Sequence, residues 1–209
     1  MSQKNPALND ETEVPNKNKT LPKFDKIASV KFYAANAVAI SQSPFTFKSS
    51  THFYGGQQWA VDVTYPPLER SEAEEIIAFL LDLRGSVGTF RMGDPNAVKT
   101  RGDATGGFTL SNATNINDEK ITVSQLGTNN KFAVGDYLEL NGQLLKILRQ
   151  NPVSGDIHVW PRIRKVSKQG DSVYYEKPRG LFRLKSASSD FSINNASQYG
   201  ISFSAVEVV

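Results

Sequence analysis

One alternating stretch constrains the fold of this chain most strongly. Residues 58–65 alternate between polar and apolar side chains, which places four apolar residues on one face: Trp59, Val61, Val63 and Tyr65. A period of two is typical of a β-strand that buries a single face. The strand must end at Pro66 and Pro67, because proline cannot donate to a sheet ladder. We expect Gly55 and Gly56 to form the turn that joins it to an earlier strand, within a segment that contains Phe45, Phe47 and Phe53.

A second patterned strand lies at the C-terminus. Residues 199–209 alternate in the same way, with Ile201, Phe203 and Ala205 on one face. A strand at a chain end frays unless it pairs with strands already formed. We therefore expect it to close the sheet that contains residues 58–65, together with further strands near 180–184 and 191–193.

The sequence predicts one amphipathic helix, over about residues 71–84. Apolar side chains recur there at spacings of three and four, which gives a single apolar stripe. Ser71 followed by Glu74 has the form of a capping box at the N-terminus. Arg84 and Gly85 are typical of a helix end. A helix with one apolar side must lie on a sheet.

Residues 96–177 have a different texture. Short apolar runs are separated there by turn residues, as in a small β-barrel or sandwich. The clearest hairpin turn is Asn141-Gly142, because both residue types tolerate positive φ. We interpret 96–177 as an inserted domain within a discontinuous core formed by 27–95 and 178–209. The fold class is therefore mainly β (α+β): a β-sandwich or barrel core with one helix.

Residues 1–26 resemble neither part. They are polar, contain three prolines and have no aromatic residue before Phe24. Such a segment buries too little apolar surface to offset its ordering entropy. The sequence predicts an extended or disordered arm, which is either inert or lies on a neighbouring subunit.

Composition excludes several classes of function. The charges of the 24 basic and 21 acidic residues nearly cancel. The one basic cluster consists of Arg162, Arg164, Lys165 and Lys168. We interpret it as a solvated strand edge rather than a sequence-specific nucleic-acid site. The uncharged stretch 32–47 is too polar and too short to cross a membrane. The absence of cysteine fits folding in a reducing cytoplasm. We expect a soluble protein.

The search for chemistry finds no catalytic, cofactor-binding or metal-ligating set. The two histidines, His52 and His158, are far apart in strand-like contexts and form no metal motif. The glycine-rich residues 102–107 lack the lysine and the helix of a phosphate-binding loop, and read as a turn. We expect no cofactor, no metal and no enzymatic activity.

Aromatic residues in the insert offer an alternative function. Trp160, Tyr174 and Tyr175 could stack on sugar rings or line an interface, whereas Trp59 belongs to the apolar face of its strand. A carbohydrate-binding module that attaches to a host surface is therefore the rival hypothesis.

A series of motifs resembles the distal-tail-protein-like family of tailed bacteriophages. The members of this family are minor tail proteins or ring components of the baseplate hub. The motifs occur in this order: 54–59 (YGGQQW), 63–68 (VTYPPL), 71–74 (SEAE), 78–85 (AFLLDLRG), 88–95 (GTFRMGDP), 133–138 (AVGDYL), 157–164 (IHVWPRIR), 178–184 (PRGLFRL) and 199–207 (YGISFSAVE). The resemblance covers about residues 30–209 and leaves the N-terminal arm outside.

The resemblance implies a structural virion protein at the tail tip, made in the host cytoplasm. Members of this family form rings, usually six-fold, around the tail channel. The implied partners are copies of the same chain, the tail tube protein, the tail hub, and receptor-binding or tail fibre proteins. The discontinuous core would then build the ring, and the insert would face outward.

Overall fold

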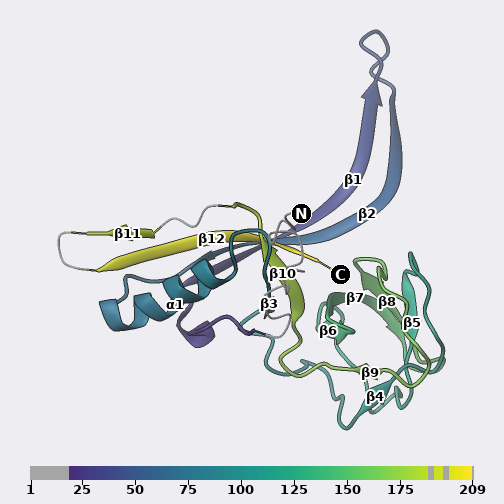
Figure 1. Cartoon of the computed structure of the whole chain (residues 1–209). Coiled ribbons are helices and arrows are strands. Elements are labelled where there is room, and N and C mark those ends of the chain that lie inside the picture. Colours follow the sequence, from purple (N-terminus) through teal and green to yellow (C-terminus); the bar gives the residue numbers. More distant parts are fainter. Residues whose placement is uncertain (1–18, 188–190, 195–197, 209) are drawn as a thin grey trace, which may run out of the picture.

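The computed structural model describes residues 19–187, 191–194 and 198–208 of the chain. The fold is mainly β with one α-helix, as the sequence predicts (Figure 1). The elements in chain order are η1 (Phe24–Lys26), β1 (Ser29–Gln42), β2 (Ser49–Thr64), α1 (Arg70–Asp82), β3 (Thr89–Met92), β4 (Phe108–Thr109), β5 (Lys120–Thr122), β6 (Tyr137–Leu140), β7 (Gln143–Asn151), β8 (Asp156–Trp160), β9 (Ser172–Val173), β10 (Gly180–Leu184), β11 (Phe191–Ile193) and β12 (Tyr199–Glu207).

The main sheet joins the middle of the chain to its C-terminus. Its strand order is β1-β2-β12-β10-β3, and β11 pairs with β12 beyond that path. β12 pairs antiparallel with β2, from Ser202 opposite Thr64 to Val206 opposite Ala60. The prediction that the C-terminal strand closes this sheet is confirmed. The strand face predicted from the alternation is also confirmed, because Trp59, Val61, Val63 and Tyr65 are all buried.

Helix α1 covers one face of this sheet and buries Ala73, Ile76, Ile77 and Leu80. The predicted capping box is wrong: Glu69 is the N-cap, and no side chain caps the helix. Leu68 pairs with Tyr199 through backbone hydrogen bonds in both directions, which keeps the chain extended up to that residue. The helix can therefore begin two residues later, at Arg70.

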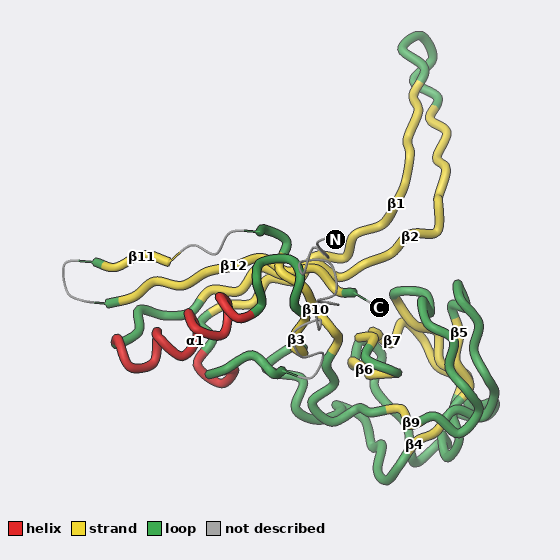
Figure 2. The backbone as a smooth tube through the Cα atoms, viewed as in Figure 1, coloured by secondary structure: helices red, strands yellow, loops and turns green. Residues whose placement is uncertain are grey.

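The insert has its own sheet and core. A curved four-stranded sheet, ordered β5-β8-β7-β6, lies beside the two-stranded ribbon of β4 and β9 (Figures 1 and 2). A second cluster of buried side chains fills the space between them, including Phe108, Leu138 and Ile157. Asn141 and Gly142 both have positive φ, 50° and 83°, so the predicted hairpin turn is confirmed.

Two buried carboxylates connect the insert to the main sheet in opposite directions. Glu139 of the insert forms an ion pair with Arg91 of β3, and Glu207 of β12 forms one with Arg164 of the insert. The backbone N–H of Leu144 donates to Glu207 Oε1 at 2.6 Å. Arg164 is therefore no solvated edge residue, because its guanidinium contacts a carboxyl group that is fully buried.

The end of the predicted N-terminal arm lies on the protein's own core. Residues 1–18 fall outside the described residues, but Leu21 is buried against the main cluster. The Arg91 N–H donates to the Lys19 carbonyl at 2.8 Å, and the Tyr65 hydroxyl donates to the Pro22 carbonyl at 2.8 Å. Three ion pairs join this segment to α1: Lys19–Asp82, Lys23–Glu75 and Lys26–Glu72. The sequence did not predict that residues 19–26 lie on the core, because a single buried leucine and backbone hydrogen bonds hold them there and neither gives an apolar pattern.

We predict that Glu207 makes stability fall as pH rises. Burial raises the pKa of Glu207 to about 7, against the opposing effect of Arg164. The folded state then binds a proton that the unfolded chain releases near pH 4.5. The resulting stability is present below that pH and is lost as pH rises toward 7, by about 3 kcal/mol in all.

Urea unfolding of the wild type and Glu207→Gln at pH 5, 6, 7 and 8 measures this component. The glutamine variant should show a flatter dependence on pH, because it cannot ionise. Equal slopes for the two proteins would contradict the assignment.

Candidate functional site

The hairpin of β1 and β2 projects from the body of the protein (Figure 1). The two strands pair over almost their whole length, but β12 pairs with β2 only at residues 60–64. In the described part of the chain, β1 pairs with no strand other than β2. The outer edge of β1 and the outer edge of residues 49–59 in β2 therefore both lack a strand partner.

The hairpin turn is not where the sequence predicts it. Gly55 and Gly56 lie inside β2, and the chain reverses at residues 43–48, where Phe47 N–H donates to the Ser43 carbonyl. The register changes between Asn36 opposite Gln57 and Val38 opposite Phe53. Tyr54 and the two glycines therefore bulge opposite a single residue of β1. Such bulges bend a strand and increase its twist, and the hairpin curves away from the sheet (Figure 2).

The outer part of the hairpin exposes apolar side chains. Val38 and Ile40 continue the alternation of Val30 and Phe32, which pack against the main core. Ile40 is 71% exposed and Phe45, at the turn, is 92% exposed. The other large apolar residues exposed here are Phe47, Phe53 and Tyr54. The apolar alternation along β1 is typical of a buried strand face, but it continues past the last residue that the core covers.

The same segment carries almost no charge. Between Phe32 and Val61 the only Asp, Glu, Lys or Arg is Lys48, although 22% of the whole chain is charged. Proteins normally protect exposed sheet edges with charges, prolines or short strands. A long, uncharged hairpin with open edges and exposed apolar side chains has the features of a surface that another chain covers.

The structure separates the three aromatic residues that the sequence singled out. Trp160 lies at the junction between the insert and the hairpin base, where its Nε1–H donates to Asn36 Oδ1 at 3.1 Å. Its ring meets Trp59 edge to face at 4.3 Å. Tyr175 packs against Phe108 in the core of the insert. Only Tyr174 presents most of its surface to solvent.

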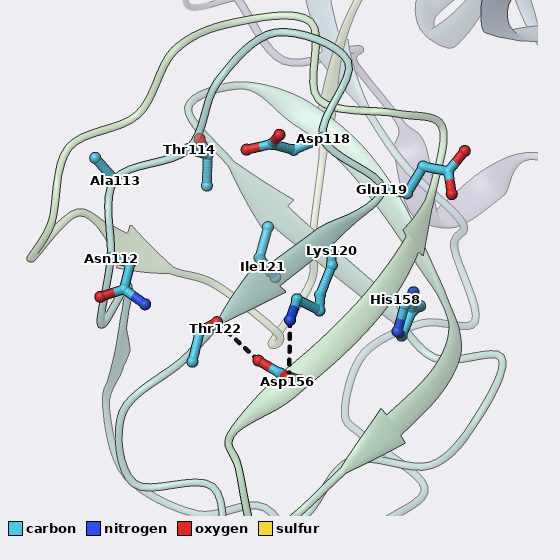
Figure 3. Close-up of a pocket in the computed structure, with 10 residues that line it drawn as sticks. All are labelled: Asn112, Ala113, Thr114, Asp118, Glu119, Lys120, Ile121, Thr122, Asp156 and His158. Atoms are coloured by element: carbon cyan, nitrogen blue, oxygen red, sulfur yellow. Dashed lines mark hydrogen bonds and ion pairs between the residues drawn. The ribbon is translucent and has the colours of Figure 1, made fainter.

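A polar depression of about 520 Å³ lies over β5 and β8 (Figure 3). Its carboxylates are already engaged. Asp156 accepts hydrogen bonds from Lys120 and Thr122, in that order the main causes that lower its pKa. Asp118 accepts from the Asn115 N–H, and Glu119 pairs with Arg162. This arrangement is typical of a solvated sheet face and leaves no free acid beside a free base.

The described residues contain no group of three or more His, Cys, Asp or Glu side chains that could hold a metal ion. His52 is exposed on the hairpin beside Tyr54, and His158 lies 3.3 Å from Arg149 through its Nδ1. The two histidines therefore belong to different parts of the molecule. No helix within the described residues is long and apolar enough to cross a membrane.

No protein-family model matches the chain, and no curated protein matches it significantly.

We predict that the exposed hairpin residues contribute little to folding. Phe45→Ala should change the free energy of unfolding of the monomer by less than about 0.5 kcal/mol, because the ring touches no core. The same substitution at fully buried Phe182 should cost about 3–5 kcal/mol, through lost burial and a cavity.

Urea unfolding at concentrations where light scattering shows a monomer compares the two variants. A cost above about 1 kcal/mol for Phe45→Ala would mean that the turn packs on its own chain.

Proposed function

We propose that this chain is a structural virion protein of a bacteriophage tail. It forms a ring at the distal tail and connects the tail tube to the hub and the receptor-binding apparatus. The observation that carries the proposal is the projecting hairpin, with two open edges and apolar side chains that its own chain leaves uncovered. The resemblance of residues 30–209 to the distal-tail-protein-like family supports the same function.

The two open edges favour a ring over a symmetric dimer. The edge of β1 and the edge of residues 49–59 lie on opposite sides of one hairpin. Pairing of β1 in one copy with β2 in the next is a head-to-tail contact between different surfaces. Repeated contacts of this kind close into a ring when the rotation between neighbours allows it. Each hairpin would then be an interior member of a continuous sheet.

Energetics point in the same direction. A two-stranded hairpin is only marginally stable in water, and an open edge invites uncontrolled aggregation. Pairing both edges with neighbouring copies would satisfy the backbone groups and would bring side chains of those copies against Val38 and Ile40, which are exposed in the single chain. Full burial of one such side chain contributes about 1.5–3 kcal/mol. Six-fold symmetry comes from the resemblance, since the geometry of one chain does not set the number of copies.

In this assembly the partners are other copies of the chain, the tail tube protein, the hub, and receptor-binding or tail fibre proteins. The hairpins would surround the tail channel, and the insert would lie outside them. The function requires no catalysis. The location that follows is the tail tip of the virion.

We predict that a charge on the hairpin disrupts assembly. Ile40→Glu should convert an oligomer of several 23.0 kDa chains into a monomer, because it puts a carboxylate into the shared apolar surface. Val153→Glu is the matched control: Val153 is 91% exposed and lies in a turn of the insert, so this variant should assemble like the wild type.

Light scattering across a hundredfold range of concentration, with electron microscopy of the same samples, measures the mass and shows any rings. A wild-type chain that stays monomeric throughout and never incorporates into tails would contradict the proposal.

A further inference from the structure

We propose that a shallow groove beside Tyr174 binds a neutral sugar ring. The groove has a volume of about 450 Å³ and is lined by the β4–β9 ribbon and the residues next to it: Gly106, Gly107, Phe108, Thr109 and residues 172–176. In Figure 1 this ribbon lies at the far side of the insert from the hairpin. The site is therefore separate from the surface proposed to form the ring.

The alternation along residues 172–176 divides buried from available side chains. Val173 is buried, and Tyr175 packs at 5.5 Å from both Phe108 and Phe132 while its hydroxyl donates to the Gly106 carbonyl. Ser172, Tyr174 and Glu176 point the other way and are exposed. Tyr174 is 57% exposed, so the groove has one available aromatic ring.

The backbone of Tyr174 is held firmly. Its carbonyl accepts from the Glu139 N–H at 2.7 Å, and its own N–H donates to the Glu139 carbonyl at 2.9 Å. Glu139 is itself fixed by its ion pair with Arg91. A ring on such a rigid backbone loses little conformational freedom when a ligand stacks on it, which favours binding.

Glycine keeps the space beside the ring open. β4 and β9 are antiparallel, with Phe108 opposite Val173. One residue further along, the same register places Gly107 opposite Tyr174. A Cβ at Gly107 would meet no atom within 4 Å. There is accordingly room beside the tyrosine for a flat ligand, and no opposing side chain fills it.

The polar groups around the groove fit hydroxyl groups rather than anions. Within the described residues, the Glu176 carboxylate and the Ser172 hydroxyl form no hydrogen bond, so both can pair with a ligand. The lining contains one acidic residue and no Lys or Arg, which disfavours phosphates and acidic sugars. An aromatic face with a few polar groups at its rim suits a pyranose, whose C–H face stacks and whose hydroxyls donate to a carboxylate.

The polar depression in Figure 3 makes a useful comparison. It is similar in volume but has no Tyr, Trp or Phe in its lining, and its carboxylates already have partners. Its single aromatic ring is the imidazole of His158, which already contacts Arg149, and a sugar there would find no free carboxylate. The groove beside Tyr174 combines an exposed tyrosine ring with a carboxylate, that of Glu176, that has no partner within the described residues.

Saturation-transfer NMR on the full chain tests the proposal with five neutral sugars as probes: glucose, galactose, mannose, N-acetylglucosamine and N-acetylgalactosamine. At least one should give a signal with the wild type. Tyr174→Ala should weaken its binding at least tenfold, because the stacking surface is gone. Tyr174→Phe keeps the ring and should bind within threefold of the wild type, whereas Glu176→Gln should bind several-fold more weakly.

Two controls make the result specific. Tyr54→Ala removes a tyrosine of the hairpin that is slightly more exposed than Tyr174 and should leave sugar binding unchanged, as should Asn112→Ala in the depression of Figure 3. N-acetylneuraminic acid, an anionic sugar, should not bind.

Three results would overturn the site: no signal from any of the five sugars, equal binding by Tyr174→Ala, or a change of oligomeric state in Tyr174→Ala without a change in sugar binding. The last result would identify Tyr174 as a protein contact. None of these outcomes depends on ring formation, so this proposal and the proposed function can fail separately.

Discussion

The pairing of β12 with β2 is the contact on which the rest of this structure depends. Only five residues of β2 take part, opposite residues 202–206, yet they attach the whole projecting hairpin to the body. Asp62 strengthens this point, because the Ser204 hydroxyl donates to one of its oxygens and the Tyr33 hydroxyl to the other. These two hydrogen bonds, Ser204 first, lower the pKa of Asp62. Three strands are thereby joined at the base of the hairpin.

The same strand, β12, also fixes the insert. Glu207, at its end, lies under the insert and pairs with Arg164, while Glu139 of the insert pairs with Arg91 of β3. Removing one partner of such a pair leaves the buried carboxyl group without its hydrogen-bond donor, which costs more than losing a surface ion pair. Trp59 Nε1–H donates to the Leu144 carbonyl at 2.9 Å across the same junction. The insert and the hairpin are therefore both held by one short piece of sheet, and they also contact each other where Trp160 meets Asn36.

The candidate surfaces were only partly predictable from sequence. The apolar alternation marked Trp59 and Val61 as core, because a period of two is readable without knowing the partner strand. The alternation of Val30 and Phe32 in β1 likewise continues to Val38 and Ile40, but these two are exposed, since a pattern does not reveal where the covering layer ends. The prediction of a turn at Gly55 and Gly56 was wrong for a similar reason. Gly55 has a positive φ of 84°, a conformation that occurs in β-bulges as well as in turns. The near absence of charge from residue 32 to 61 was the available signal for an interface.

The sequence by itself determined the local structure: a mainly β chain, one amphipathic helix, the Asn141-Gly142 turn, and a C-terminal strand that must pair. These features depend on side-chain periodicity and on backbone conformations that few residue types adopt. Only the tertiary structure decided which aromatic residues are available and which edges are open. Trp160 and Tyr174 are both aromatic residues in short strand-like segments of the insert. The Trp160 ring is held at the junction with the hairpin, whereas the Tyr174 ring faces solvent. That difference arises from contacts with residues more than thirty positions away, and local patterns carry no record of them.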